Sequence, residues 1–171
     1  METREILADA YTRISELAHR SVKGAGRDIL TYRPEPGSNS IAWLVWHLSR
    51  IQDNHVSEIA GKEQAWVTGG WAQKFGMEPD PENDGRGHGP AEVAGIKPDP
   101  DLILAYHDAV SGRTQEYLRT VDADELGRII DRSYDPPVSV GVRLVSVISD
   151  NIQHAGQARY LRGTAERLGL K

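Results

Sequence analysis

Asp150 and His154 are four residues apart in the segment SDNIQHAGQARYLRG, residues 149–163, which contains no proline and has aliphatic residues at helical spacing. In a helix, residues at positions i and i+4 lie on the same face, one turn apart. This spacing lets two side chains hold one metal ion, as paired histidines do in helical zinc sites. The aspartate and the histidine can therefore offer an oxygen and a nitrogen ligand to one divalent cation.

Both residues fall on the apolar side of the expected helix, and Arg143 lies on the same side. Burying an unpaired carboxylate costs several kcal/mol or forces it to bind a proton. Two explanations remain open: a hydrogen-bonded Asp–His pair near the surface, or a bound cation. At 100° per residue, the face is defined by Val140, Leu144, Val147, Ala158, Leu161 and Ala165.

A second apolar segment, residues 41–60, contains two more histidines, His47 at the edge of its apolar stripe and His55 nearer the middle. They are eight residues apart, about 12 Å along a helix axis, which argues against one shared ion. His47 is thus free to join Asp150 and His154 from a facing helix. A His₂Asp set has the three ligands of a catalytic zinc site, which keeps one position open. Nickel, iron and manganese would also accept it.

Four amphipathic segments must position these residues, and they predict an all-α four-helix bundle. A helical domain with a small sheet in the connection 61–98 is the alternative. Ser38 or Ser40, Asp99 and Ser139 are suitable N-cap residues, and Gly61 ends the second segment. The expected helices cover residues 3–22, about 41–60, 100 to about 121, and 140 to about 168.

The connection 61–98 has no long periodic segment and includes the glycine-rich stretch DGRGHGP. Connections of this length inside a compact domain are usually functional or disordered. Trp66, Trp71 and Phe75 favour a packed segment, which we expect to form a wall or lid of a pocket. His88 could reach such a pocket from the glycine-rich stretch. The whole chain, residues 1–171, is predicted to be a single domain.

The composition excludes several classes of protein. The 171 residues include no cysteine and carry a net charge of −5. Negative charge argues against a nucleic-acid partner. The lack of a long apolar run argues against a membrane span, and the acidic N-terminal stretch against a secretory signal, so a cytoplasmic protein is expected. Without cysteine, any thiol that reacts here must be a ligand.

Two long segments, SIAWLVWHLSRIQDNHVSEIAG and VGVRLVSVISDNIQHAGQARYLRG, resemble the DinB/YfiT-like superfamily of metalloenzymes, and within it the actinobacterial mycothiol-dependent S-transferases and maleylpyruvate isomerases. The similarity extends over nearly the whole chain and includes GKEQAW, GWAQKFGM and DPPVSVGVRLVSV. It implies an antiparallel-type four-helix bundle with a metal between helices. His47 matches the histidine of a W-H-L motif, and His154 that of an H-x-G-Q motif. Asp150 stands where many members have histidine and the isomerases have glutamate.

The resemblance implies a metal-dependent thiol S-transferase. A divalent ion, with zinc as the expected one, would stabilise the thiolate of mycothiol for attack on a small electrophile. His55 is a candidate proton acceptor or water-binding residue, and Arg143 a candidate contact for an anionic group of substrate. A metal-dependent hydrolase, a thiol-dependent isomerase and a non-catalytic metal-stabilised bundle remain as alternatives. An exposed face of the bundle could support a homodimer.

Overall fold

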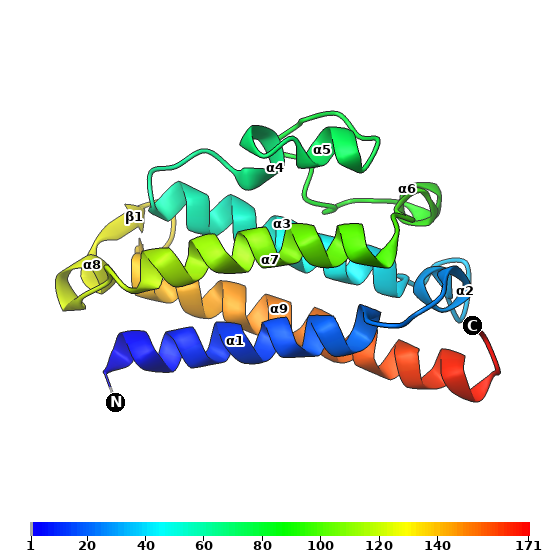
Figure 1. Cartoon of the computed structure of the whole chain (residues 1–171). Helices are drawn as coiled ribbons and strands as arrows, with labels where there is room; N and C mark the ends of the chain where they lie inside the picture. The colour runs from blue at the N-terminus through cyan, green and yellow to red at the C-terminus, as the bar shows by residue number, and fades with distance from the viewer. Residues whose placement is uncertain (1) are drawn as a thin grey trace.

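The computed structural model describes residues 2–171, most of which are helical (Figure 1). Four helices are much longer than the others, and they match the four expected segments closely. Ser40 and Ser139 cap two of them, because their hydroxyl groups accept hydrogen bonds from backbone N–H groups of the first turn. The all-α prediction is confirmed. The long helices are α1 (Thr3–Val22), α3 (Ile41–Ile59), α7 (Pro100–Leu118) and α9 (Val140–Arg167).

The long helices lie side by side, with α3 and α1 each packed against both α7 and α9. Figure 1 shows that α1 and α9 run in one direction and that α3 and α7 run in the other. The contacts of α3 with α9 and of α1 with α7 are therefore antiparallel, as expected, whereas the other two are parallel. Because α3 and α7 are parallel, the chain must travel back along the helices between them, which explains the long connection.

Five short helices and two short strands complete the fold of the described residues. The alternative with a sheet inside residues 61–98 is wrong, since that segment holds only α4, α5 and α6. An antiparallel strand pair, β1 and β2, instead connects α8 to α9, and two- to three-residue strands are too short to show an alternating pattern. Neither α2 nor α8 was predicted from the sequence. The bounds are α2 (Arg27–Thr31), α4 (Ala65–Thr68), α5 (Trp71–Lys74), α6 (Pro90–Gly95), α8 (Ala123–Gly127), β1 (Ile129–Asp131) and β2 (Val138–Ser139).

Helix α3 is the most enclosed of the long helices. Most of its residues are buried, because α7, α9 and the connection 61–98 cover different sides of it. Trp66 of α4 is fully buried against Trp46 of α3, with ring centroids 6.1 Å apart. The aromatic residues of the connection therefore pack into the core, as predicted. No helix within residues 2–171 combines the length and the apolar character that a membrane crossing requires.

The polar side chain of His107, in α7, lies fully inside this core. Its Nδ1 is 2.9 Å from the Ser49 hydroxyl, which itself donates to the carbonyl of Val45. Its Nε2 is buried and has no hydrogen-bond partner among residues 2–171. Burial lowers the pKa of His107 to about 4; nearby Asp108 raises the pKa and nearby His19 lowers it further. The folded protein therefore holds this imidazole neutral.

We expect His107 to make the protein less stable in acid. The pKa is about 4 when folded, against 6.5 for an exposed histidine, so the unfolded chain binds more protons between these values. The free energy of unfolding should therefore fall as pH decreases from 6.5 toward 4, with about 2 kcal/mol lost between pH 7.5 and pH 5. His107→Leu removes this titration and leaves Ser49 bonded to Val45. Urea denaturation at both pH values checks the prediction. An equal loss in both proteins would contradict it.

Candidate metal centre

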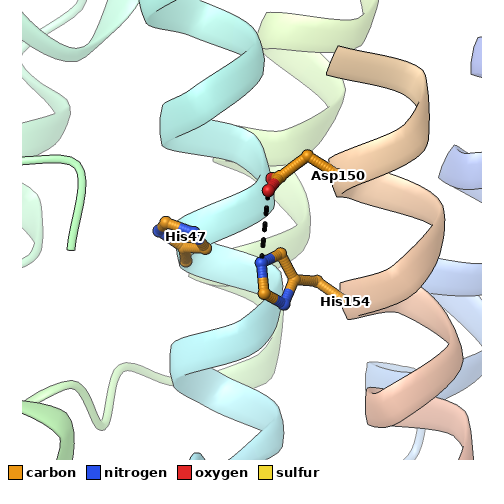
Figure 2. Close-up of side chains that lie close together, drawn as sticks. All are labelled: His47, Asp150 and His154. Carbon is orange, nitrogen blue, oxygen red and sulfur yellow. Dashed lines mark ion pairs between the residues drawn. The ribbon is translucent and has the colours of Figure 1, made fainter. Parts of the chain in front are cut away.

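His47 of α3 faces Asp150 and His154 of α9, and the three side chains converge between the two helices (Figure 2). One ligand atom from each residue can be chosen so that all three lie within 4.8 Å of one another. The imidazole rings of His47 and His154 are nearly perpendicular, with centroids 4.8 Å apart. The structure thus brings together the three residues that the sequence singled out as metal ligands.

The protein fixes His47 on two sides. Its side chain is buried, with only 4% of its surface exposed, and it stacks on Trp43 with ring centroids 4.5 Å apart. Its Nδ1 contacts the backbone carbonyl of Asp84. A carbonyl can only accept, so Nδ1 must carry the proton and Nε2 is left with a free lone pair. Burial also lowers the pKa of His47, which keeps the ring neutral. A neutral imidazole with its far nitrogen held by a carbonyl is the usual state of a metal ligand.

Asp150 and His154 form an ion pair on α9, with Oδ1 and Nε2 3.6 Å apart. Pairing with Asp150 raises the pKa of His154, and pairing with His154 lowers the pKa of Asp150. His154 Nδ1 lies 3.4 Å from the side-chain oxygen of Gln157, so Nε2 points toward the centre of the cluster. The pairing between the two that the sequence left open is therefore present.

The ion pair alone does not satisfy Asp150. Its second carboxylate oxygen, Oδ2, is buried and has no hydrogen-bond partner among residues 2–171. A buried carboxylate oxygen without a donor is costly unless a cation lies near it. The cluster offers two imidazole nitrogens and a carboxylate oxygen, a donor set that zinc, nickel, iron and manganese accept. The residues present therefore fit a divalent metal ion.

The loop of residues 81–89, between α5 and α6, holds His47 in place. Gly85 packs so closely on α3 that a Cβ there would lie 2.8 Å from the Trp46 ring and 3.0 Å from His47 Nδ1, and its φ of +98° also favours glycine. His88 stacks on Trp46 with centroids 5.6 Å apart and accepts a hydrogen bond from Trp43 Nε1. His88 therefore anchors the loop, and it is not among the residues that line the cleft beside the cluster.

A buried ion pair of α3, Arg50 and Asp53, also holds the loop in place. Arg50 is fully buried, and its guanidinium donates to the backbone carbonyls of Pro81 and Asn83 at 2.9 and 3.0 Å. Asp53, 3.5 Å from Arg50, accepts hydrogen bonds from the backbone N–H groups of Ala65 and Trp66 at 2.8 and 2.7 Å. These contacts tie two stretches of the connection, residues 65–66 and 81–83, to α3, so the position of the Asp84 carbonyl depends on them.

A cleft of about 500 Å³ opens beside Asp150. His55 and Arg143, which the sequence proposed for catalysis and substrate binding, both line it, and they contact each other through His55 Nδ1 and Arg143 Nη1 at 2.7 Å. Arg86 of the loop forms another part of the wall, which agrees with the expectation that the connection contributes to a pocket. His47 and His154 do not line this cleft, so Asp150 is the residue that the cluster and the cleft share.

Sequence reasoning missed the residues that support the cluster. The Asp84 carbonyl is a backbone group whose role depends on the path of the loop, and no residue type signals it. Arg50 and Asp53 did leave a signal, since two residues of opposite charge stand three positions apart, directly after the apolar first half of the helix. Such residues are almost never fully buried unless they are paired. Gly85 belongs to a glycine-rich stretch that was considered only as part of an irregular connection.

Comparisons with known proteins agree with this fold. The model of the DinB superfamily matches residues 10–158, and the chain therefore belongs to this superfamily. A crystal structure of a conserved protein from Enterococcus faecalis is similar, with 29% sequence identity and a TM-score of 0.87, over 95% of this chain and 96% of that one. None of the curated proteins compared with the sequence matches it.

Proposed function

We propose that this protein is a metal-dependent thiol S-transferase that joins a low-molecular-weight thiol, mycothiol in the first instance, to a small electrophile. The observation that carries the proposal is the unsatisfied Oδ2 of Asp150, which lies in a three-ligand cluster and at the edge of the cleft. Three protein ligands would leave a coordination position for a sulfur atom. Membership of the DinB superfamily and the absence of cysteine from the chain fit this chemistry.

The proposed ion, zinc in the first instance, would supply positive charge that favours the thiolate over the thiol at neutral pH. His47, Asp150 and His154 would hold that ion, and the Asp84 carbonyl would keep His47 in the required tautomer. The electrophile would occupy the cleft, next to Asp150. A sulfur–carbon bond forms, and the thiol proton leaves with the displaced group or adds to the acceptor. The cleft is large enough for a small reactant of this kind.

A conjugation assay tests the proposal. The zinc-loaded protein is incubated with mycothiol and 1-chloro-2,4-dinitrobenzene, and thioether formation is followed by absorbance. We expect catalysis above the reaction of the free thiol, and a loss of at least about a hundredfold in His154→Ala, because one of three ligands is removed. His19→Ala is the matched control, since His19 pairs with Asp108 away from the cluster.

Unchanged conjugation in His154→Ala would refute the proposed mechanism. Glutathione and coenzyme A, assayed beside mycothiol, show whether the site selects the thiol. Cleavage of 4-nitrophenyl acetate without any thiol would instead favour a hydrolase that uses the same ligands. Metal content, measured by elemental analysis on each sample, separates loss of the ion from loss of a residue that acts on the reactants.

A further inference from the structure

The polar wall of the cleft consists mainly of hydrogen-bond donors. Arg86, His55 and Arg143 come from three different parts of the chain, the loop 81–89, α3 and α9, and all line the same space. Asp150 is the only carboxylate in the wall, and Ile51 and Val147 supply apolar surface. A site with two guanidinium groups beside apolar side chains suits a ligand with an anionic group on a compact hydrocarbon body.

The contact between Arg143 and His55 fixes which nitrogen of His55 carries the proton. A guanidinium is always protonated and only donates, so His55 Nδ1, 2.7 Å from Arg143 Nη1, must accept. A neutral imidazole then carries its proton on Nε2. Burial and the positive charge of Arg143 both lower the pKa of His55 and so favour the neutral ring. In this arrangement His55 offers a donor, which fits the water-binding role expected from the sequence and differs from the alternative, a proton acceptor.

Arg143 and Arg86 each pair with carboxylates that do not line the cleft. Glu58 and Asp131 lie 3.5 and 4.0 Å from Arg143. Asp84, itself buried, binds Nε and Nη2 of Arg86, whose side chain is 65% exposed. These pairs orient the guanidinium groups and leave outward donors. They also limit how much negative charge the cleft can take, because a ligand with two charges would be repelled by Glu58 and Asp131. A carboxylate therefore suits the cleft better than a phosphate.

We propose that the cleft binds the carboxylate of a small organic acid through Arg143, Arg86 and the Nε2–H of His55, and that this acid is the electrophile of the transfer. This inference rests on the proposed function for its second part only. The apolar body of the acid would lie against Ile51 and Val147, and its reactive carbon would point toward Asp150 and the ligand cluster. A carboxylate carried by the thiol instead would use the same donors, and the experiment must distinguish the two sources.

Binding measurements without catalysis test the site directly. The zinc-loaded protein is titrated in a calorimeter with 4-chloro-3-nitrobenzoate and with its methyl ester, which has the same body but no charge. We expect the acid to bind at least about tenfold more tightly than the ester, because charge-assisted hydrogen bonds depend on the anion. Arg143→Met and Arg86→Met should each reduce this preference, and Arg143→Lys should retain part of it. Arg13→Met removes the same charge from an exposed position of α1 and should leave the preference for the acid unchanged.

A second pair of probes, 3-mercaptopropionate and 3-mercapto-1-propanol, asks whether the carboxylate belongs to the thiol. The assignment to the electrophile would be overturned by two results together. The protein would prefer 3-mercaptopropionate over 3-mercapto-1-propanol, with Arg143→Met removing that preference, and it would show no preference between 4-chloro-3-nitrobenzoate and its methyl ester. Equal binding of acid and ester to the wild-type protein, or a preference that survives in both arginine variants, would overturn the site itself. Tight acid binding without any thioether product would uphold the site and refute the proposed transfer, so the two failures are distinguishable.

Discussion

His47→Ala will lower the affinity of the protein for Zn²⁺ by about a hundredfold to a thousandfold. Structural zinc sites bind with about 10–16 kcal/mol from four ligands, so each ligand is worth about two to three orders of magnitude in affinity. His47 is the only one of the three ligands contributed by α3, so its removal leaves Asp150 and His154 of α9 with no facing partner. Competition with a chromophoric chelator at fixed pH measures the change.

Two further variants sharpen this result. Asp150→Asn keeps the size of the side chain and removes its charge, and a similar loss would show that the carboxylate, with its unsatisfied Oδ2, takes part. His19→Ala is the matched control, because His19 pairs with Asp108 and belongs neither to the cluster nor to the loop that holds His47. We expect a much smaller effect there. Wild-type affinity in His47→Ala would contradict the metal centre as described.

Helix geometry predicted part of the ligand cluster, and the family resemblance implied the full set. The i,i+4 spacing placed Asp150 and His154 on one face of α9, and the apolar patterns brought α3 and α9 together. The burial of His47 was harder to predict from the sequence. The sequence placed it at the edge of an apolar stripe, where a helix with one solvent-facing side would leave it partly exposed. The connection 61–98 covers that side, and the path of an irregular segment does not follow from periodicity.

The same limit explains why the short helices and strands, and the parallel contacts between long helices, were not predicted. Helix directions depend on connection lengths, and the length of residues 61–98 was read as a sign of function more than of topology. The connection carries the chain back between the parallel helices α3 and α7 (Figure 1). It also supplies Arg86 to the wall of the cleft and the Asp84 carbonyl to His47. The oppositely charged pair Arg50 and Asp53 in α3 was the strongest unused signal that polar groups of another segment pack there.

Arg50→Met will destabilise the fold by about 3–5 kcal/mol, because it leaves Asp53 buried without its cationic partner and the Asn83 carbonyl without its donor. The Pro81 carbonyl keeps the amide of Gln64 as a donor. Methionine fills much of the volume of arginine, so the loss reports polar contacts more than a cavity. The effect should spread to the metal centre. Loop 81–89 would lose one of its anchors, the Asp84 carbonyl would hold His47 less firmly, and Zn²⁺ affinity should fall by about ten- to a hundredfold, as for other partners of metal-bound histidines.

Urea unfolding of the metal-free protein and chelator competition under folding conditions separate the two effects. Arg50→Lys keeps the charge but cannot reach both carbonyls with a planar fork, so it should recover part of the stability and less of the affinity. Arg20→Met removes an exposed arginine paired with Glu16 on α1 and should change either quantity little. A destabilised Arg50→Met protein with wild-type Zn²⁺ affinity would show that the loop carbonyl does not orient His47. The support of the metal centre would then be limited to the helices themselves.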